Sequence, residues 1–292
     1  MTGATCFWGA MTELTPAMLM MRECRVREGI VPDTLAGMRI AVGKNDMVGE
    51  EFLLRDDGLA IYYRRGDGVT VQLDDQSKAG MLELFLSGTV HSAIAALNGL
   101  TPIHASAVAI DGRAFAFSGA SGAGKSTTAA ALRQRGLPIV ADDTLVVDLS
   151  TPAPNCLPGH KRLKLWPDSL ALTGLPSLQL VSEDYRKFFA TDSGSDVDAP
   201  LPLAAIIGLE IGEDPSFEPV RGAQRITLLD DDHYTAYLHS SARGHDRAGR
   251  LAALAALANR IEVFRFVRPL DPARFTESID LLIDRLSQVS SR

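Results

Sequence analysis

The hydrophobic and polar positions of the first hundred residues predict a small antiparallel sheet followed by a helix. Short strand-like runs at 52–54, 59–63 and 69–73 are separated by the turn sequences Asp-Asp-Gly and Gly-Asp-Gly, which are typical of hairpins. Over 78–97 apolar residues return every three or four positions, as on one face of a helix, and Asn98 with Gly99 ends the pattern. This part carries no recognisable chemistry. We therefore interpret residues 1–100 as a small N-terminal mixed β/α domain that is a structural cap or docks a peptide.

After residue 100 strand patterns alternate with helix patterns. Two strand-like runs, 104–110 and 113–118, are joined by the tight-turn pair Asp111 and Gly112. Further strands are predicted at 139–149, 201–211 and 262–267, helices at 126–135, 248–258 and 272–288, and a mobile polar loop at 182–200. Alternation of this kind predicts an α/β fold with α+β elements, in which helices flank a sheet. Residues 101–292 are expected to form this second domain.

Composition narrows the class of protein. The 292 residues are 46% hydrophobic and 22% charged, as in ordinary globular proteins. The net charge of −7 argues against bulk nucleic-acid binding, which needs an excess of cations. Cys6, Cys24 and Cys156 form no CxxC pair, which indicates reduced thiols. With no targeting segment and no membrane span apparent, we expect a soluble cytoplasmic protein; the pattern leaves its oligomeric state open, a homo-oligomer included.

One motif dominates the chemistry. The sequence GASGAGKS at 119–126 fits G-x-x-x-x-G-K-[ST] and lies between a predicted strand and a predicted helix. Its glycines let backbone N–H groups turn toward phosphate oxygens, and the helix N-terminus favours the same anion. ATP and Mg²⁺ are the expected ligands, with Lys125 on the β- and γ-phosphates and the Ser126 hydroxyl on the metal. The residues predicted to bind the nucleotide are Gly119, Ala120, Ser121, Gly122, Ala123, Gly124, Lys125, Ser126 and Thr127.

Two acidic residues and one histidine are the further candidates. Asp142 and Asp143 follow a short apolar run, and one carboxylate could bind Mg²⁺ while the other accepts the proton of an attacking hydroxyl. A solvated turn is the alternative for this pair. His104 is expected at the end of its hairpin where the phosphate loop begins, so its imidazole could donate to the γ-phosphate or orient Asp142. A purely structural histidine is the alternative there.

The order of His104, the glycine-rich loop and the sequence Ala-Asp-Asp at 141–143 resembles the catalytic domain of HPr kinase/phosphorylase and its relatives. The resemblance is strong over residues 101–150 and thin over residues 151–292, and it does not extend to the first hundred residues. It implies a P-loop kinase that uses ATP and Mg²⁺ to phosphorylate a serine hydroxyl of a protein or peptide. It also implies Asp142 as the catalytic acid/base, Asp143 as the metal-side carboxylate, and His104 and Lys125 as active-site residues. Arg250 matches the arginine that begins the family's late helix and is expected to contact phosphate.

The segment LPGHKRLKLWPDS departs from the bifunctional HPr enzymes, because it lacks their Glu-Ile-Arg-Gly signature. In this it resembles the shorter HPr-kinase-like proteins of lasso peptide clusters, which implies a precursor peptide or small protein as acceptor. Its basic residues Lys161, Arg162 and Lys164 are predicted to clamp the transferred phosphate or a peptide carboxylate; a charged strand edge is the alternative. A second function fits the same loop, namely a P-loop NTPase that acts as a regulatory or assembly switch without phosphorylating a partner.

Overall fold

The computed structural model describes the chain except for residues 1–13, 183–184, 191–196, 231–237, 239–246 and 292. In the described residues it is a mixed α/β protein with several mixed sheets, which confirms the predicted fold class at that level. The N-terminal elements are α1 (Pro16–Glu23), β1 (Val26–Glu28), β2 (Thr34–Leu35), β3 (Met38–Arg39), β4 (Lys44–Val48), β5 (Glu51–Asp56), β6 (Leu59–Arg64), β7 (Gly68–Leu73), a 3-10 turn (Gln76–Lys78), α2 (Ala79–Phe85), a π-helical turn (Leu86–Val90) and α3 (His91–Leu97).

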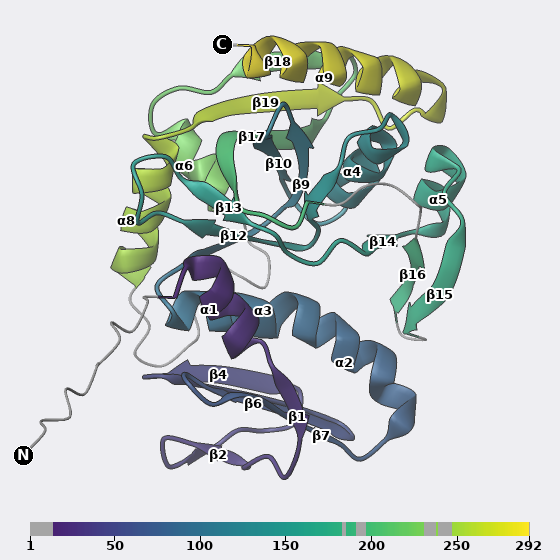
Figure 1. Ribbon diagram of the computed structural model, residues 1–292. Coiled ribbons are helices and arrows are strands. Elements are labelled where there is room, and N and C mark those ends of the chain that lie inside the picture. The colour runs from purple at the N-terminus through teal and green to yellow at the C-terminus, as the bar shows by residue number, and fades with distance from the viewer. Residues whose placement is uncertain (1–13, 183–184, 191–196, 231–237, 239–246, 292) are drawn as a thin grey trace, which may run out of the picture.

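The elements that follow belong to the larger part of the molecule (Figure 1). They are β8 (Thr101–His104), β9 (Ser106–Ile110), β10 (Arg113–Ser118), α4 (Lys125–Gln134), β11 (Ile139–Ala141), β12 (Thr144–Asp148), β13 (Asn155–Leu157), β14 (Leu163–Leu165), α5 (Pro167–Thr173), β15 (Ser177–Ser182), β16 (Tyr185–Ala190), β17 (Leu201–Ile211), β18 (Ser216–Pro219), α6 (Gln224–Leu229), α8 (Arg247–Ala258), β19 (Glu262–Arg268), a 3-10 turn (Pro272–Arg274) and α9 (Phe275–Ser290).

The N-terminal sheet has the strand order β1-β7-β6-β5-β4, and its antiparallel hairpins are the ones that the turn sequences predict. Strand β1 adds to β7 in parallel. Along β6, Leu59, Ile61 and Tyr63 are buried while the residues between them retain exposed surface, which is the period-two alternation of a half-buried strand. The buried face of this sheet is covered by α1 and by the helix that follows β7.

A nearly continuous helix crosses from the N-terminal sheet to the rest of the molecule (Figure 1). The stretch Gln76–Leu97 has 22 residues with a mean hydropathy of 1.3, so by length and composition alone it could cross a membrane. Part of its apolar surface is packed inside the protein. Val90, Ala93 and Ile94 are buried in one core with the N-terminal sheet and with Val146 and Leu157 of β12 and β13. This is the environment of a core helix in a globular protein.

The larger part is organised around β17. This strand pairs in parallel with β10 and with β19, and its first residues pair antiparallel with β13. Strands β9 and β11 continue the sheet beyond β10, and β12 and β8 continue it beyond β13, giving nine strands when β18 is included. A separate three-stranded sheet, β14-β16-β15, lies beside α5.

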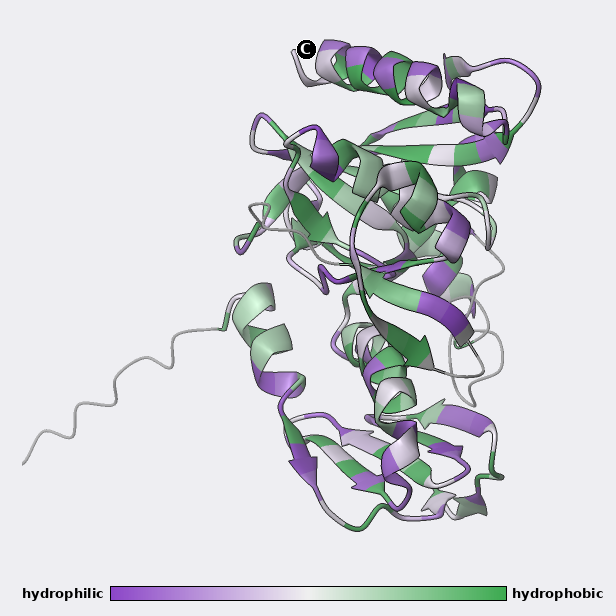
Figure 2. Cartoon of the chain, turned by 90° about the vertical axis from the view of Figure 1, so that its right-hand side faces the viewer, coloured by the Kyte–Doolittle hydropathy of each residue, from purple (hydrophilic) through white to green (hydrophobic). Residues whose placement is uncertain are grey.

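Alternation along β10 separates two cores. Phe115 and Phe117 point to the face covered by α4 and α9, while Ala114 and Ala116 point to the face covered by α6 and α8. Each buried phenylalanine contributes about 2–3 kcal/mol relative to an exposed one. Helix α9 places apolar residues inward at helical spacing, and Figure 2 shows its hydrophobic and hydrophilic residues alternating along the ribbon.

The structure corrects three of the predicted elements. The strand expected at 104–110 is two strands with different neighbours, since β8 pairs with β12 while β9 pairs with β10 and β11. The strand expected at 139–149 is likewise broken into β11 and β12. The loop expected at 182–200 contains β16, which is held by its partners β14 and β15 rather than by a strong local pattern.

The predicted division at residue 100 stays a prediction. Before residue 100, β1 and β4 to β7 form one sheet with its covering helices, and β2 pairs with β3 in a separate two-stranded sheet; β8 onward build the other sheets. One core nevertheless contains residues from both sides of residue 100, because Val146 and Leu157 pack with Val90 and Ile94. Independent folding of either part is therefore not implied by the sheet topology.

His91, at the start of α3, gives the fold a pH dependence. Burial, and then the neighbouring His160 ring, lower the pKa of His91 from its ordinary value of 6.5 to about 4. The unfolded chain therefore binds a proton more readily than the folded one, so stability is full above about pH 6.5 and is lost as pH falls toward 4. We expect the parent protein to lose about 1 kcal/mol between pH 7.5 and 5.5 through this group. Denaturant unfolding at the two pH values measures this loss. Between them the free energy of unfolding should fall by about 1 kcal/mol less in His91→Gln than in the parent. An equal fall in both proteins would contradict the assignment.

Candidate functional site: a glycine-rich loop facing an acidic pair

The glycine-rich loop, residues 119–126, joins the end of β10 to the start of α4. Gly124 caps the helix with φ at 95°, a left-handed conformation that a side chain would strain. A Cβ at this position would also collide with the guanidinium of Arg268 at the end of β19. The loop therefore needs glycine at 124 for two reasons. The glycine-rich loop leads into the N-terminus of α4, where backbone N–H groups without helical partners can bind an anion.

Lys125 is the first residue of α4 and is 7% exposed. Its Nζ donates to the carbonyl oxygens of Gly119 at 2.7 Å and Ala120 at 3.3 Å, so the side chain folds back over the loop. Thr127, one turn into the helix, donates from Oγ1 to the Ser169 hydroxyl of α5 at 2.8 Å. These contacts fix the loop between two helices.

The acidic pair occupies the break between β11 and β12. A second break of this kind lies between β8, which ends at His104, and β9, which begins at Ser106. Because His104 is in register with Thr144, the two interruptions face one another across the sheet. Sheet pairing thus brings His104, Ser106, Asp142 and Asp143 together beside the end of β10, where the glycine-rich loop begins.

Asp142 is 1% exposed and is held by several donors. The Ser106 hydroxyl donates to Oδ1 at 2.6 Å, and the backbone N–H of Lys164 lies 3.4 Å from Oδ2. The Ser126 hydroxyl of the glycine-rich loop is close enough to lower the pKa of this carboxyl group. Burial, followed by the negative charge of Asp143, raises the pKa of Asp142, and the hydroxyl donors and the Lys164 charge partly offset that rise. The carboxylate is therefore directly beside the serine of the loop.

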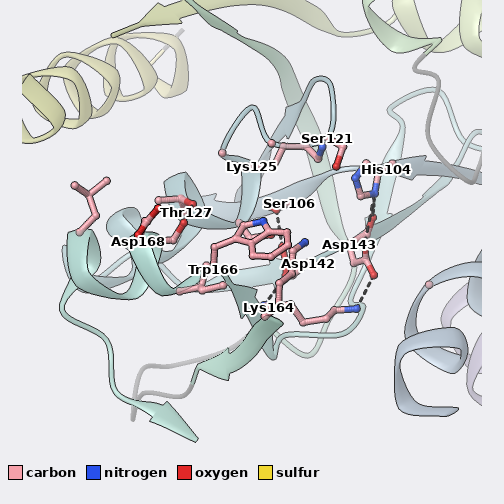
Figure 3. A pocket seen from close by; sticks show the side chains of 18 of the residues that line it. His104, Ser106, Ser121, Lys125, Thr127, Asp142, Asp143, Lys164, Trp166 and Asp168 are labelled. Carbon is pink, nitrogen blue, oxygen red and sulfur yellow. Dashed lines mark hydrogen bonds and ion pairs between the residues drawn. The ribbon is translucent and has the colours of Figure 1, made fainter. Parts of the chain in front are cut away.

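Asp143 has a different environment. Its φ of 74° is left-handed, which is uncommon for a residue with a side chain and is found where surrounding contacts impose it. Lys164 Nζ donates to Oδ2 at 2.6 Å, and His104 Nδ1 lies 2.8 Å from the Asp143 carbonyl oxygen and 3.5 Å from Oδ1. A carbonyl oxygen only accepts, so Nδ1 carries the proton in this contact and Nε2 is left as an acceptor when the ring is neutral. Figure 3 shows Asp143 between His104 and Lys164.

These groups line one cavity of about 940 Å³. Its residues come from the glycine-rich loop and α4, from the two strand breaks, from β14 and α5, from β16, from the end of β19, and from the helix around residues 84–89. In Figure 3 Thr127 and Asp168 lie toward one end of this cavity, while His104, Asp143 and Lys164 lie toward the other, with Asp142 between them. A cavity of this size is typical of small-molecule and cofactor sites.

Not every residue predicted for the site reaches it. Lys164 lines the cavity, but Lys161 and Arg162 do not: Lys161 pairs with Asp198, and Arg162 pairs with Glu83 and stacks on the Phe189 ring at 4.0 Å. Arg250 lies on α8, outside the cavity lining, and its Nε is 3.5 Å from Asp230. The expected clamp of three cations from this segment is thus reduced to Lys164 among the cavity residues.

Three cavity residues were not found from the sequence. Ser106 carries no motif, and only the pairing of β9 with β10 and β11 brings it to Asp142. Lys187 comes from the unpredicted strand β16; burial lowers its pKa, and the charges of Asp142 and Asp143 act in the opposite direction. Arg268 is 5% exposed and donates from Nη2 to Ala123 O at 3.3 Å. A charged residue ending the apolar run of β19 was the one sequence feature that could have identified Arg268.

The donor set fits a nucleotide triphosphate with a magnesium ion. Backbone N–H groups and Lys125 can hold phosphate oxygens at the helix N-terminus. The Ser126 hydroxyl and the Asp142 carboxylate are adjacent oxygen ligands of the kind that Mg²⁺ takes together with substrate phosphates. Among the described residues no cluster of three or more His, Cys, Asp or Glu side chains could hold a metal without such a substrate.

The comparisons with known proteins found similar solved structures but no matching sequence. No family model matches the sequence, and no curated protein matches it. Among solved structures, that of the Hpr(Ser) kinase/phosphatase from Coxiella burnetii is similar, with a TM-score of 0.33 and 14% sequence identity over 65% of this chain and 92% of that chain.

Proposed function

We propose that this protein is an ATP- and Mg²⁺-dependent kinase that transfers the γ-phosphoryl group of ATP to a serine hydroxyl of a peptide or small protein. The observation that carries the proposal is the position of the acidic pair. Asp142 and Asp143 line the same cavity as Lys125 and Ser126, and the helix around residues 84–89 lines that cavity as well. A phosphoryl acceptor therefore has room on the far side of the carboxylates.

The glycine-rich loop is the polyphosphate site in this proposal. Its N–H groups and the N-terminus of α4 bind the phosphate oxygens, and Lys125 moves from the carbonyl oxygens of Gly119 and Ala120 to the β- and γ-phosphates. When bound, Mg²⁺ neutralises charge on the β- and γ-phosphate oxygens. Arg268, buried against Ala123, adds positive charge at the same loop.

The geometry favours an exchange of the roles that the family resemblance implies for the two aspartates. Asp142 is 1% exposed, and the Ser126 hydroxyl, which lines the same cavity, is close enough to lower its pKa, so Asp142 is the better candidate for the metal side. The side chain of Asp143 is 16% exposed within the cavity wall, and it is better located to accept the proton of an acceptor hydroxyl. We therefore propose Asp143 as the general base and Asp142 as the metal-side carboxylate.

Lys164 and His104 orient Asp143 for this task. The ammonium group of Lys164 holds one carboxylate oxygen at 2.6 Å and also supplies a positive charge close to where the transferred phosphoryl group passes. His104 holds the Asp143 backbone from the opposite side at 2.8 Å. Together they maintain the left-handed backbone that aims the carboxylate into the cavity.

The experiment is a phosphoryl-transfer assay. The purified protein is incubated with γ-labelled ATP, Mg²⁺ and a library of serine peptides, and label is followed into peptide and into free phosphate. Label on a peptide that disappears when its serine is replaced by alanine supports the kinase. Label released only as inorganic phosphate would favour the alternative of a P-loop NTPase switch and overturn the proposal.

A further inference from the structure

One wall of the cavity comes from the N-terminal part of the chain. Leu84 and Phe85 at the end of α2, and Gly88 and Thr89 in the π-helical turn, line the same cavity as the glycine-rich loop and the acidic pair. No chemical motif is recognisable in the sequence of this part of the chain. Single π-helical turns inside α-helices are rare and occur often at functional sites.

This wall is attached to the proposed catalytic residues by hydrogen bonds. Lys164 Nζ, which donates to Asp143, also donates to the Ser87 hydroxyl at 3.0 Å. The Thr144 hydroxyl, next to Asp143 in the chain, lies 3.2 Å from the Ser92 hydroxyl and 3.5 Å from Gly88 O. The wall is therefore fixed at the end of the cavity where Asp143 and Lys164 lie, and not at the end where Thr127 and Asp168 lie.

Leu84 differs from its apolar neighbours. Met81, Leu82, Phe85 and Leu86 pack against the core of the N-terminal sheet, whereas Leu84, among the described residues, belongs to none of the hydrophobic cores. It is half-buried and lines the cavity. An apolar side chain that faces a cavity instead of a core is available to an apolar group of a ligand.

The two ends of the cavity suit different ligands. With the γ-phosphate of a bound nucleotide toward the acidic pair, the nucleoside would lie toward Thr127 and Asp168, at the opposite end of the cavity (Figure 3). The remaining end combines a proton acceptor, two lysines and an apolar wall. That combination suits a hydroxyl carried by a chain with an apolar side chain beside it.

We propose that residues 84–89 form the acceptor-binding wall, and that the acceptor is a peptide whose phosphorylated serine has a large apolar neighbour that packs on Leu84. The inference rests on the proposed kinase function. It assigns to the N-terminal part a direct role in acceptor choice, with Leu84 as a specificity-determining residue and Ser87 as a positioning residue for Lys164.

The test uses two short peptides, Ala-Ala-Leu-Ser-Leu-Ala-Ala and Ala-Ala-Ala-Ser-Ala-Ala-Ala, with the full-length protein. The parent should phosphorylate the leucine peptide with a kcat/KM about tenfold higher, the usual range for one apolar contact. Leu84→Ala should bring the ratio of the two values close to one, mainly through KM for the leucine peptide, with KM for ATP unchanged. Leu251→Ala, on the exposed face of α8, is the matched control and should keep the parental ratio.

The results distinguish an error in the proposed acceptor wall from an error in the proposed kinase function. Leu84→Asp provides a second variant, which should lower use of the leucine peptide further while the folded state, checked by circular dichroism, is retained. If both peptides are labelled and the ratio is the same in the parent and in both Leu84 variants, the acceptor wall is wrong and the kinase stands. If neither peptide nor any library peptide is labelled, the proposed function fails, and the inference fails with it.

Discussion

Lys125→Ala is expected to lower the affinity for Mg-ATP about 100-fold and to leave the fold in place. The Lys125 ammonium lies at the glycine-rich loop and lines the cavity, and its charge-assisted bonds to phosphate are strong. A 100-fold loss corresponds to about 2.7 kcal/mol. In the protein alone, Lys125 makes two hydrogen bonds to loop carbonyls, at 2.7 and 3.3 Å, so the variant loses only local contacts. Isothermal titration calorimetry with Mg-ATP measures the affinity.

Lys44→Ala is the matched control for this measurement. Lys44 begins β4 of the N-terminal sheet, is exposed and does not line the cavity. The Lys44→Ala substitution removes the same charge from the molecule, so any change in affinity due to net charge alone appears in both variants. Should Lys125→Ala fold normally and bind Mg-ATP as tightly as Lys44→Ala and the parent, residues 119–126 do not form the phosphate site.

The second large effect is expected at the acidic pair, where the two aspartates should respond differently. Asp143→Asn should keep Mg-ATP binding and lower phosphoryl transfer by about 10²–10⁴, the usual contribution of a general base. Asparagine tolerates the left-handed backbone at this position, so the substitution removes the charge without adding strain. Asp142→Asn should raise the Mg²⁺ concentration needed for half-maximal transfer, because it removes the carboxylate beside Ser126.

A magnesium titration of both variants distinguishes the two assignments. The opposite pattern, with a raised Mg²⁺ requirement in Asp143→Asn and loss of transfer alone in Asp142→Asn, would restore the roles that the family resemblance implies. Asp57→Asn, in an exposed turn of the N-terminal sheet, controls for the loss of one negative charge. Parental rates in both active-site variants would mean that the pair has no catalytic role.

Local patterns in the sequence determined the parts of the fold whose neighbours are close in the chain. The hairpins β5-β6 and β6-β7 follow from alternation and turn residues, and α4 and α9 from helical periodicity. The breaks at Ala105 and at Asp142 with Asp143 could not be seen in this way. An apolar run has the sequence pattern of a single strand even when its two halves pair with different strands. Here β8 pairs with β12, while β9 pairs with β10.

For the site, the sequence by itself determined which residue types can carry chemistry and their order along the chain. The glycine-rich loop with Lys125 and Ser126 is contiguous, so its pattern is visible without a structure, and the acidic pair follows it closely. Only the tertiary structure decided which aspartate lies beside Ser126, that Lys164 reaches the cavity while Arg162 does not, and that the helix with Leu84 closes it. These outcomes depend on strand register and on packing between distant segments, and no local sequence pattern encodes either.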